Sequence, residues 1–169
     1  FDPDITHEFL SSSKTRDKII RQILMYAELF RLDGINLDFE NVYLEDKDLL
    51  VQFVRELTPI LREAGIVVSM DVTAKSTSPN WSLCYDRKEL GKTVDYMILM
   101  AYDEHWATSP VSGSVASIGW VERGIATLLE DVPPEKVILG LPFYTREWEE
   151  TPTENGSTAV KSRAISMAQ

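Results

Sequence analysis

The sequence predicts an α/β fold in which parallel strands alternate with crossover helices. Four short segments are largely apolar on both faces, and amphipathic stretches with helical spacing separate them. Strands of this kind are typical of a parallel sheet that helices cover. The chain has 169 residues, of which 44% are hydrophobic, enough for one compact core. We therefore expect a single domain over residues 1–169, with an ordered core at about 14–148 and a loosely held polar tail at 149–169.

The first predicted helix follows the polar cluster SSSKT and runs to about Arg31, because apolar residues recur there at helical spacing. The period then changes to two in GINLDFENV (34–42), which predicts a strand. A second helix, capped by Asp46 or Asp48, continues to Leu61. These three segments form the first β/α unit of the predicted sheet.

Three further strands are predicted at 66–74, 95–102 and 136–144. A short helix near 86–90 separates the first two, and a longer one, with Trp120 facing inward, ends before the Pro133-Pro134 pair. The remaining residues are polar, and only their end has a weak helical pattern. The order is that of consecutive β/α units.

Composition excludes several functions. The chain carries 17 Lys and Arg against 27 Asp and Glu, a net charge of -10, which argues against a nucleic-acid partner. One Cys and two His form no disulfide framework and no metal cluster, so we expect no metal and no cofactor. No apolar run approaches the roughly 20 residues that span a bilayer, so no membrane span is expected.

The stretch DGINLDFENV places three polar side chains at every second position of an otherwise apolar run: Asn36, Asp38 and Glu40. In a strand these side chains share one face, opposite the apolar residues that meet the helices. Ligands collect at the carboxyl ends of parallel strands. Two carboxylates so close together in a partly dry site should raise at least one pKa, as a general acid for glycosidic cleavage requires.

This stretch resembles the D-G-x-x-x-D-x-E signature of glycoside hydrolase family 18, the chitinases and their relatives. MAYDEHW (100–106) is similar to the family's M-x-Y-D segment, and GLPFYTREW (140–148) is similar to its next strand. The three motifs follow the family's order over roughly residues 14–148. Their combination is closest to the bacterial branch of N-acetylglucosaminidases that act on spore cortex and cell wall.

The resemblance implies a role for each matching residue. Glu40 is the general acid and later the base, while the substrate's own acetamido oxygen is the nucleophile. Asp38 orients and stabilises that group, and Tyr102 donates a hydrogen bond to it. Asp103 helps to position the sugar, and two residues of the last strand, Tyr144 and Arg146, line the cleft.

Two departures from the family pattern stand out. Many members have an aspartate where this chain has Asn36, whose amide we expect to bond to Asp38. The family fold is an eight-stranded barrel of roughly 250 residues, whereas this chain holds four strands, which match strands four to seven. The sequence therefore predicts a partial TIM barrel, about half of one. Its open sheet edges predict self-association, which light scattering of the isolated chain tests.

Several residues have readings that the sequence leaves open. Asp33 favours a structural turn role, and His105 a hydrogen bond within a loop. Asp71 fits either a role in the cleft or a salt bridge. Tryptophans in the loops could stack on sugars or pack the loops: Trp81, Trp106 and Trp148.

The resemblance implies hydrolysis of β-1,4 bonds in N-acetylglucosamine polymers, with peptidoglycan of the spore cortex first and chitin second. It also implies an extracellular, cell-envelope or spore-surface location. One alternative is a carbohydrate-binding protein that has lost catalysis. A second is a Mg²⁺-dependent barrel enzyme that uses carboxylates at strand ends, Asp71 and Asp103 among them.

Overall fold

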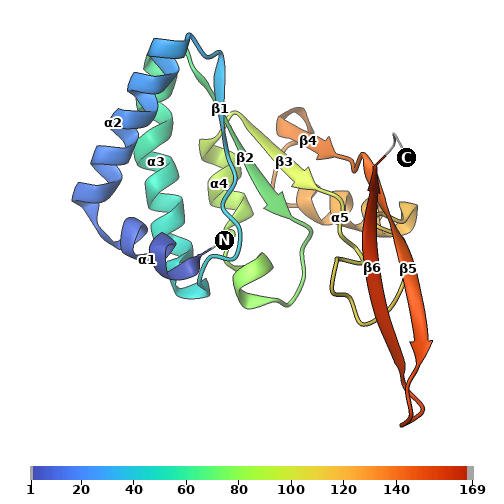
Figure 1. Cartoon of the computed structure of the whole chain (residues 1–169). Helices are drawn as coiled ribbons and strands as arrows, with labels where there is room; N and C mark the ends of the chain where they lie inside the picture. Colours follow the sequence, from blue (N-terminus) through green and yellow to red (C-terminus); the bar gives the residue numbers. More distant parts are fainter. Residues whose placement is uncertain (1, 167–169) are drawn as a thin grey trace.

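Four parallel strands form one sheet in the order β1-β2-β3-β4, each paired with the next along the chain (Figure 1). The strands are β1 (Gly34–Leu37), β2 (Val67–Thr73), β3 (Tyr96–Met100) and β4 (Val137–Gly140). This computed structural model describes residues 2–166. Consecutive parallel strands joined by helices make an arc of a β/α barrel, so the predicted α/β class is confirmed.

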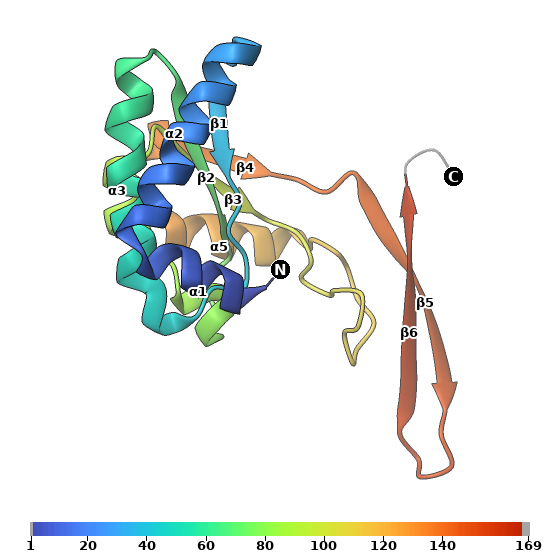
Figure 2. The ribbon, with the colours of Figure 1, turned by 60° about the vertical axis from the view of Figure 1, so that its left-hand side comes forward.

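Helices connect the strands and cover one face of the sheet. The α-helices of the described residues are α1 (Pro3–Ser11), α2 (Ser13–Phe30), α3 (Lys47–Glu63), α4 (Arg87–Thr93) and α5 (Ile118–Leu129). Short helical turns lie at η1 (Leu44–Asp46), η2 (Pro79–Leu83) and η3 (Pro134–Lys136). Figure 2 shows α1, α2 and α3 together on one side of the strands. None of the helices in residues 2–166 is long and apolar enough to cross a membrane.

Alternation along β2 separates the core from the open face of the sheet. Val68, Met70 and Val72 are fully buried against the helices. Ser69 and Asp71, which alternate with them, lie on the opposite face and are only partly covered. The face away from the helices is therefore the one that carries polar side chains, as the period of two predicts.

The segment after β1 is held by the packing of the Phe39 ring and by a side-chain hydrogen bond to the Phe39 carbonyl. The ring of Phe39 packs against Phe9 and Phe53, with ring centroids 6.1 and 5.8 Å away. The hydroxyl of the buried Tyr85 donates to the carbonyl of Phe39. Strand geometry ends at Leu37, earlier than the predicted 34–42, so these contacts, rather than a strand ladder, fix the residues that follow.

The C-terminal part of the chain corrects the predicted tail. Residues Tyr144–Pro152 (β5) and Thr158–Ser166 (β6) form an antiparallel hairpin that projects away from the parallel sheet (Figures 1 and 2). The predicted helical end is wrong for the described residues, and the ordered part extends past residue 148. A turn with Gly156 at φ 79° joins the strands. Asn-Gly pairs favour such turns, so Asn155-Gly156 was the missed signal.

One face of the hairpin holds the long loop between β3 and α5. Trp148 Nε1 donates to the carbonyl of Gly113 at 2.9 Å, and Ser162 Oγ donates to the carbonyl of Ala107 at 2.8 Å. Side chains on this face of β5 are partly covered, whereas those between them are exposed. The hairpin therefore supports a loop that reaches the carboxyl ends of the strands.

Two apolar surfaces are exposed in the described part of the chain. On α2 they include Tyr26, Leu29 and Phe30, and around β4 they include Ile138, Leu141 and Phe143, the last with 80% of its area exposed. Exposed apolar side chains grouped in this way are typical of faces that another element or chain covers. The predicted self-association stays a prediction.

Candidate active site

Residues from three strand ends meet a cavity of about 610 Å³ on the open side of the sheet. Glu40 reaches it from the segment after β1, and Tyr102 and Asp103 reach it from the segment after β3. The remaining predicted site residues, Asn36, Asp38, Tyr144 and Arg146, are not among the residues that line it.

Glu40 has the electrostatic surroundings of a proton donor. Burial raises the pKa of its carboxyl group, and the nearby carboxylates of Asp38, Asp71 and Asp103 raise it further. Among residues 2–166, no Lys, Arg or His nitrogen lies within 4 Å of the Glu40 carboxylate to oppose this. The raised pKa expected of one carboxyl group in the DFE motif therefore belongs to Glu40.

The hydrogen bonds of Asn36 differ from the expected bond to Asp38. Its amide nitrogen donates to Asp71 Oδ2 at 2.7 Å, not to Asp38, and its amide oxygen accepts from Ser69 Oγ at 2.7 Å. Asp71 makes no ion pair within the described chain, so its place is on the open face with Asn36 rather than in a salt bridge. Burial raises the pKa of Asp71, the bond from Asn36 lowers it, and the charge of Asp38 raises it.

Asp103 is held from the hairpin. Tyr144 Oη donates to its Oδ1 at 2.6 Å, and Arg146 Nη2 lies 3.5 Å from the same oxygen. The Arg146 side chain is only 11% exposed, and its Nε has no hydrogen-bond partner in residues 2–166. Asp103 has a φ of 58°, a strained backbone conformation for a residue with a side chain, which such contacts stabilise. Tyr144 and Arg146, predicted to line the cleft, thus act on Asp103.

Tyr102 packs against Tyr144 and lies near several carboxylates of the site. Its ring meets that of Tyr144 edge to face, with centroids 6.4 Å apart. Burial raises the pKa of the Tyr102 hydroxyl, and the charges of Asp71, Asp38 and Glu40 raise it further. The hydroxyl therefore keeps its proton and can donate a hydrogen bond into the cavity.

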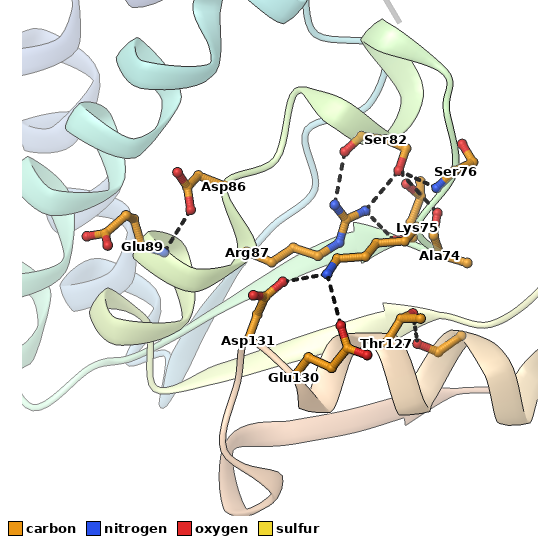
Figure 3. Close-up of polar contacts among 12 residues, drawn as sticks. Ala74, Lys75, Ser76, Ser82, Asp86, Arg87, Glu89, Thr127, Glu130 and Asp131 are labelled. Carbon is orange, nitrogen blue, oxygen red and sulfur yellow. Dashed lines mark hydrogen bonds and ion pairs between the residues drawn. The ribbon is translucent and has the colours of Figure 1, made fainter.

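One wall of the cavity is formed by the end of β2 and the loop that follows it, which contacts of Arg87 and Lys75 hold in place. The residues of this loop that line the cavity are Thr73, Ala74, Lys75, Ser76 and Ser78. The buried guanidinium of Arg87 donates to the carbonyl of Thr73 at 2.8 Å and to that of Ser82 at 3.0 Å, the latter visible in Figure 3. Lys75 Nζ lies 2.8 Å from Asp131, which ties the same loop to the end of α5 (Figure 3). These lining residues carried no motif, so the sequence did not reveal them.

Three tryptophans line the cavity: Trp81, Trp106 and Trp120. Trp81 and Trp106 are 41% and 50% exposed, as a platform for a sugar ring requires. Trp148 instead packs the loop through its bond to Gly113. Trp120 was expected only as an inward side chain of its helix. His105 Nδ1 lies 2.9 Å from the carbonyl of Ser114, which confirms the expected loop contact.

No group of three His, Cys, Asp or Glu side chains in the part of the chain that the structure describes is arranged to hold a metal ion. The carboxylates of the site come from the segment after β1, from β2 and from the segment after β3. Within residues 2–166, no cluster of three such side chains therefore supports the magnesium alternative.

A parallel β/α sheet with paired carboxylates and a tryptophan-lined cavity at its strand ends is the arrangement of a barrel glycosidase. The chain belongs to the glycosyl hydrolases family 18, because the family's model matches residues 6–168. This confirms the family that the three motifs suggested.

The relatives extend this finding. The chain is 36% identical over 150 residues to the "Putative sporulation-specific glycosylase YdhD" of Bacillus subtilis, covering 88% of this chain and 35% of the relative. The crystal structure of YdhD superposes with a TM-score of 0.88 and 33% identity, over 99% of this chain and 55% of that one. The spore cortex-lytic enzyme SleL of Bacillus cereus gives a TM-score of 0.87 and 26% identity, over 99% and 38% of the two chains.

The chain spans only part of these proteins. It covers between 35% and 46% of the length of the first two curated relatives. The four strands described here are thus comparable to a portion of the relatives' domains, which agrees with the predicted partial barrel.

Proposed function

We propose that a complete domain containing this chain hydrolyses β-1,4 bonds in N-acetylglucosamine polymers. Glu40 carries the proposal, because its carboxyl group faces the cavity with a raised pKa and no opposing cation among the described residues. A carboxylic acid that keeps its proton near neutral pH is the group that a glycosidase needs to protonate a leaving oxygen. Membership of family 18 supports the same chemistry.

The reaction proceeds with retention in two steps. Glu40 gives its proton to the glycosidic oxygen while the substrate's acetamido oxygen attacks the anomeric carbon, and the bond to the leaving sugar breaks. The product is a cyclic oxazolinium ion. Water then attacks the anomeric carbon, gives its proton to Glu40 and reopens the ring. Atoms and charge balance over the two steps, and Glu40 ends protonated, as it began.

The neighbouring residues position the sugar and stabilise the positive charge that develops on it. The Asp38 carboxylate orients the acetamido group and stabilises the oxazolinium ion. Tyr102 donates a hydrogen bond to the acetamido oxygen from a hydroxyl that its surroundings keep protonated. Asp103, held by Tyr144 and Arg146, positions the sugar at the other end of the site.

Peptidoglycan, including that of the spore cortex, is the first proposed substrate, and chitin is the second. The names of the curated relatives support this order, because a cortical fragment-lytic enzyme is 28% identical to this chain and a probable chitinase is 24% identical. The exposed rings of Trp81 and Trp106 give the cavity stacking surfaces for either glycan. A substrate of this kind places the protein outside the cytoplasm, at the cell envelope or spore surface.

The test compares cortex muropeptides with chitin oligosaccharides as substrates of the complete domain. We expect cleavage of at least one of them, with products of retained configuration in the first seconds of a proton NMR time course. Glu40→Gln should lower kcat by about 10²–10⁴-fold. The matched control is Glu45→Gln, an exposed glutamate five residues along, which should leave kcat unchanged. If the domain binds both glycans and cleaves neither, it is a carbohydrate-binding protein without catalysis, and the proposal fails.

A further inference from the structure

The open face of β1 and β2 carries a directed chain of three polar side chains. Asn36 and Ser69 are partners in the parallel register of the two strands. Ser69 Oγ donates to the amide oxygen of Asn36, and the amide nitrogen of Asn36 donates to Asp71, each at 2.7 Å. Because the hydroxyl occupies the amide oxygen, the amide must present its hydrogens to the Asp71 carboxylate.

The carboxylate at the end of this chain has no other structural use in the described residues. Asp71 lies within β2 and is partly covered, and no Lys, Arg or His nitrogen of residues 2–166 lies within 4 Å of it. A partly buried carboxylate without a cation costs stability, and such groups are concentrated at functional sites. The Asn36 bond restrains its position without neutralising its charge.

We propose that Asp71 is a positioning residue of the glycosidase site, held by Asn36, whose negative charge controls the protonation of Glu40. This inference rests on the proposed function, because it assigns Asp71 to the acid of that reaction. Asp71 exchanges no proton with the substrate. Its charge disfavours ionisation of Glu40 before the proton is delivered, and it favours the positive charge that then develops on the sugar.

The other charged groups around Glu40 are distributed unevenly. Asp38 comes from the same segment as Glu40, while Tyr102 and Asp103 come from the segment after β3. Asp103 already has Arg146 beside it, at 3.5 Å, which offsets part of its charge. Among the described residues, Asp71 and Asp38 have no cation within 4 Å, so their negative charges act on Glu40 without being offset. Burial and these same charges account for the raised pKa of Glu40.

The test is the pH dependence of kcat/KM for the complete domain on a glycan oligosaccharide that it cleaves. Asp71→Asn removes the charge with little change of shape. The alkaline limb of the profile reports the acid, so it should move to lower pH by roughly 0.5 to 1 unit. The exchange variant N36D/D71N returns one carboxylate to the pair, and its limb should come back to within about 0.3 unit of the wild type.

A matched control separates charge from structure. Ser69→Ala removes the hydroxyl that orients Asn36 and leaves every charge in place, so its alkaline limb should not move. An Asp71→Asn variant whose activity falls equally at all pH values, with the limb unmoved, would overturn the proposal and leave Asp71 a structural residue.

A second readout does not depend on catalysis. The Glu40 carboxyl carbon is titrated by NMR in the wild type and in Asp71→Asn, and the midpoint should fall in the variant. If the domain cleaves no glycan but the midpoint falls, the electrostatic link stands and only the proposed function fails. If the midpoint is unchanged, the link itself is wrong, whether or not the domain is active.

Discussion

The carboxylates on and after β1 and β2 differ from the carboxylate after β3 in the partners that surround them. Asp38, Glu40 and Asp71 share one face, and no cation lies within 4 Å of them in residues 2–166. Asp103, in contrast, receives a hydrogen bond from Tyr144 and lies beside Arg146. Burial and the neighbouring carboxylates raise the pKa of Glu40, whereas the hydrogen bond from Tyr144 and the nearby Arg146 fix the position of Asp103. This difference fits the proposed roles, in which Glu40 transfers the proton beside the charges of Asp38 and Asp71, and Asp103 positions the sugar.

Among the substitutions that test this comparison, Asp38→Asn is expected to lower activity the most. The change keeps the shape of the side chain and removes the charge proposed to face the acetamido group and the oxazolinium ion. We expect kcat of the complete domain to fall by about 100- to 1000-fold with little change in KM. Asp33→Asn is the control, because Asp33 is exposed and only its backbone carbonyl is used, accepting from Val67 N at 3.0 Å. A loss shared equally by both variants would contradict the assignment.

A smaller loss of activity is expected when Arg146, the cation beside Asp103, is replaced. Arg146→Gln leaves Asp103 with the Tyr144 bond alone, so its strained backbone is less well held. We expect kcat/KM to fall roughly tenfold and the unfolding free energy to fall by about 1 kcal/mol, since Asp103 is partly exposed. The matched control is Arg163→Gln on β6, whose surface pair with Glu147 should matter little. Equal effects of both variants on kcat/KM would remove the distinction between the two sides.

The smallest expected effect is on stability as a function of pH. The pKa of Glu40 is raised in the folded protein by burial and by neighbouring carboxylates, so its contribution to stability is present at acid pH and is lost as pH rises through the raised pKa. Glu40→Gln should therefore gain in Tm relative to wild type as pH rises from acid through the raised pKa of Glu40.

Glu56 gives the opposite sign in the same experiment. The hydrogen bond from Arg16 lowers the pKa of Glu56, so its contribution is present at neutral pH and is lost as pH falls through that lowered pKa. Glu56→Gln should be less stable than wild type at neutral pH and approach it in acid. Thermal unfolding of the two variants across pH measures both, and a shared sign would contradict the assigned causes.

Much of the fold was predictable from period and order. The change from helical spacing to a period of two located β1, and short runs that are apolar on both faces, between helical stretches, located β2, β3 and β4. The DFE motif singled out Asp38 and Glu40 as site candidates. The hairpin was missed because its polar residues were read as a tail, although the alternation of Tyr144, Arg146 and Trp148 and the Asn155-Gly156 turn were present.

Partnerships across strands were less accessible. The bond between Asn36 and Asp71 depends on the parallel register of β1 and β2, which places residues 33 or more apart beside each other. The sequence suggested Asp38 as the partner of Asn36 because the two are neighbours on one strand face. In the same way, Tyr144 and Arg146 were recognised as site residues, but their shared partner, Asp103, comes from a different segment and follows from tertiary packing alone.

The most direct test of Glu40 as the general acid compares two substrates of the complete domain, with wild type and Glu40→Gln. One is an N-acetylglucosamine oligosaccharide, and the other carries a dinitrophenyl leaving group that departs without protonation. We expect Glu40→Gln to lower the first rate of bond cleavage by about 10²–10⁴-fold and the second by at least tenfold less. Equal losses on both substrates would show that Glu40 does not supply the proton, and the assignment of the acid would be wrong.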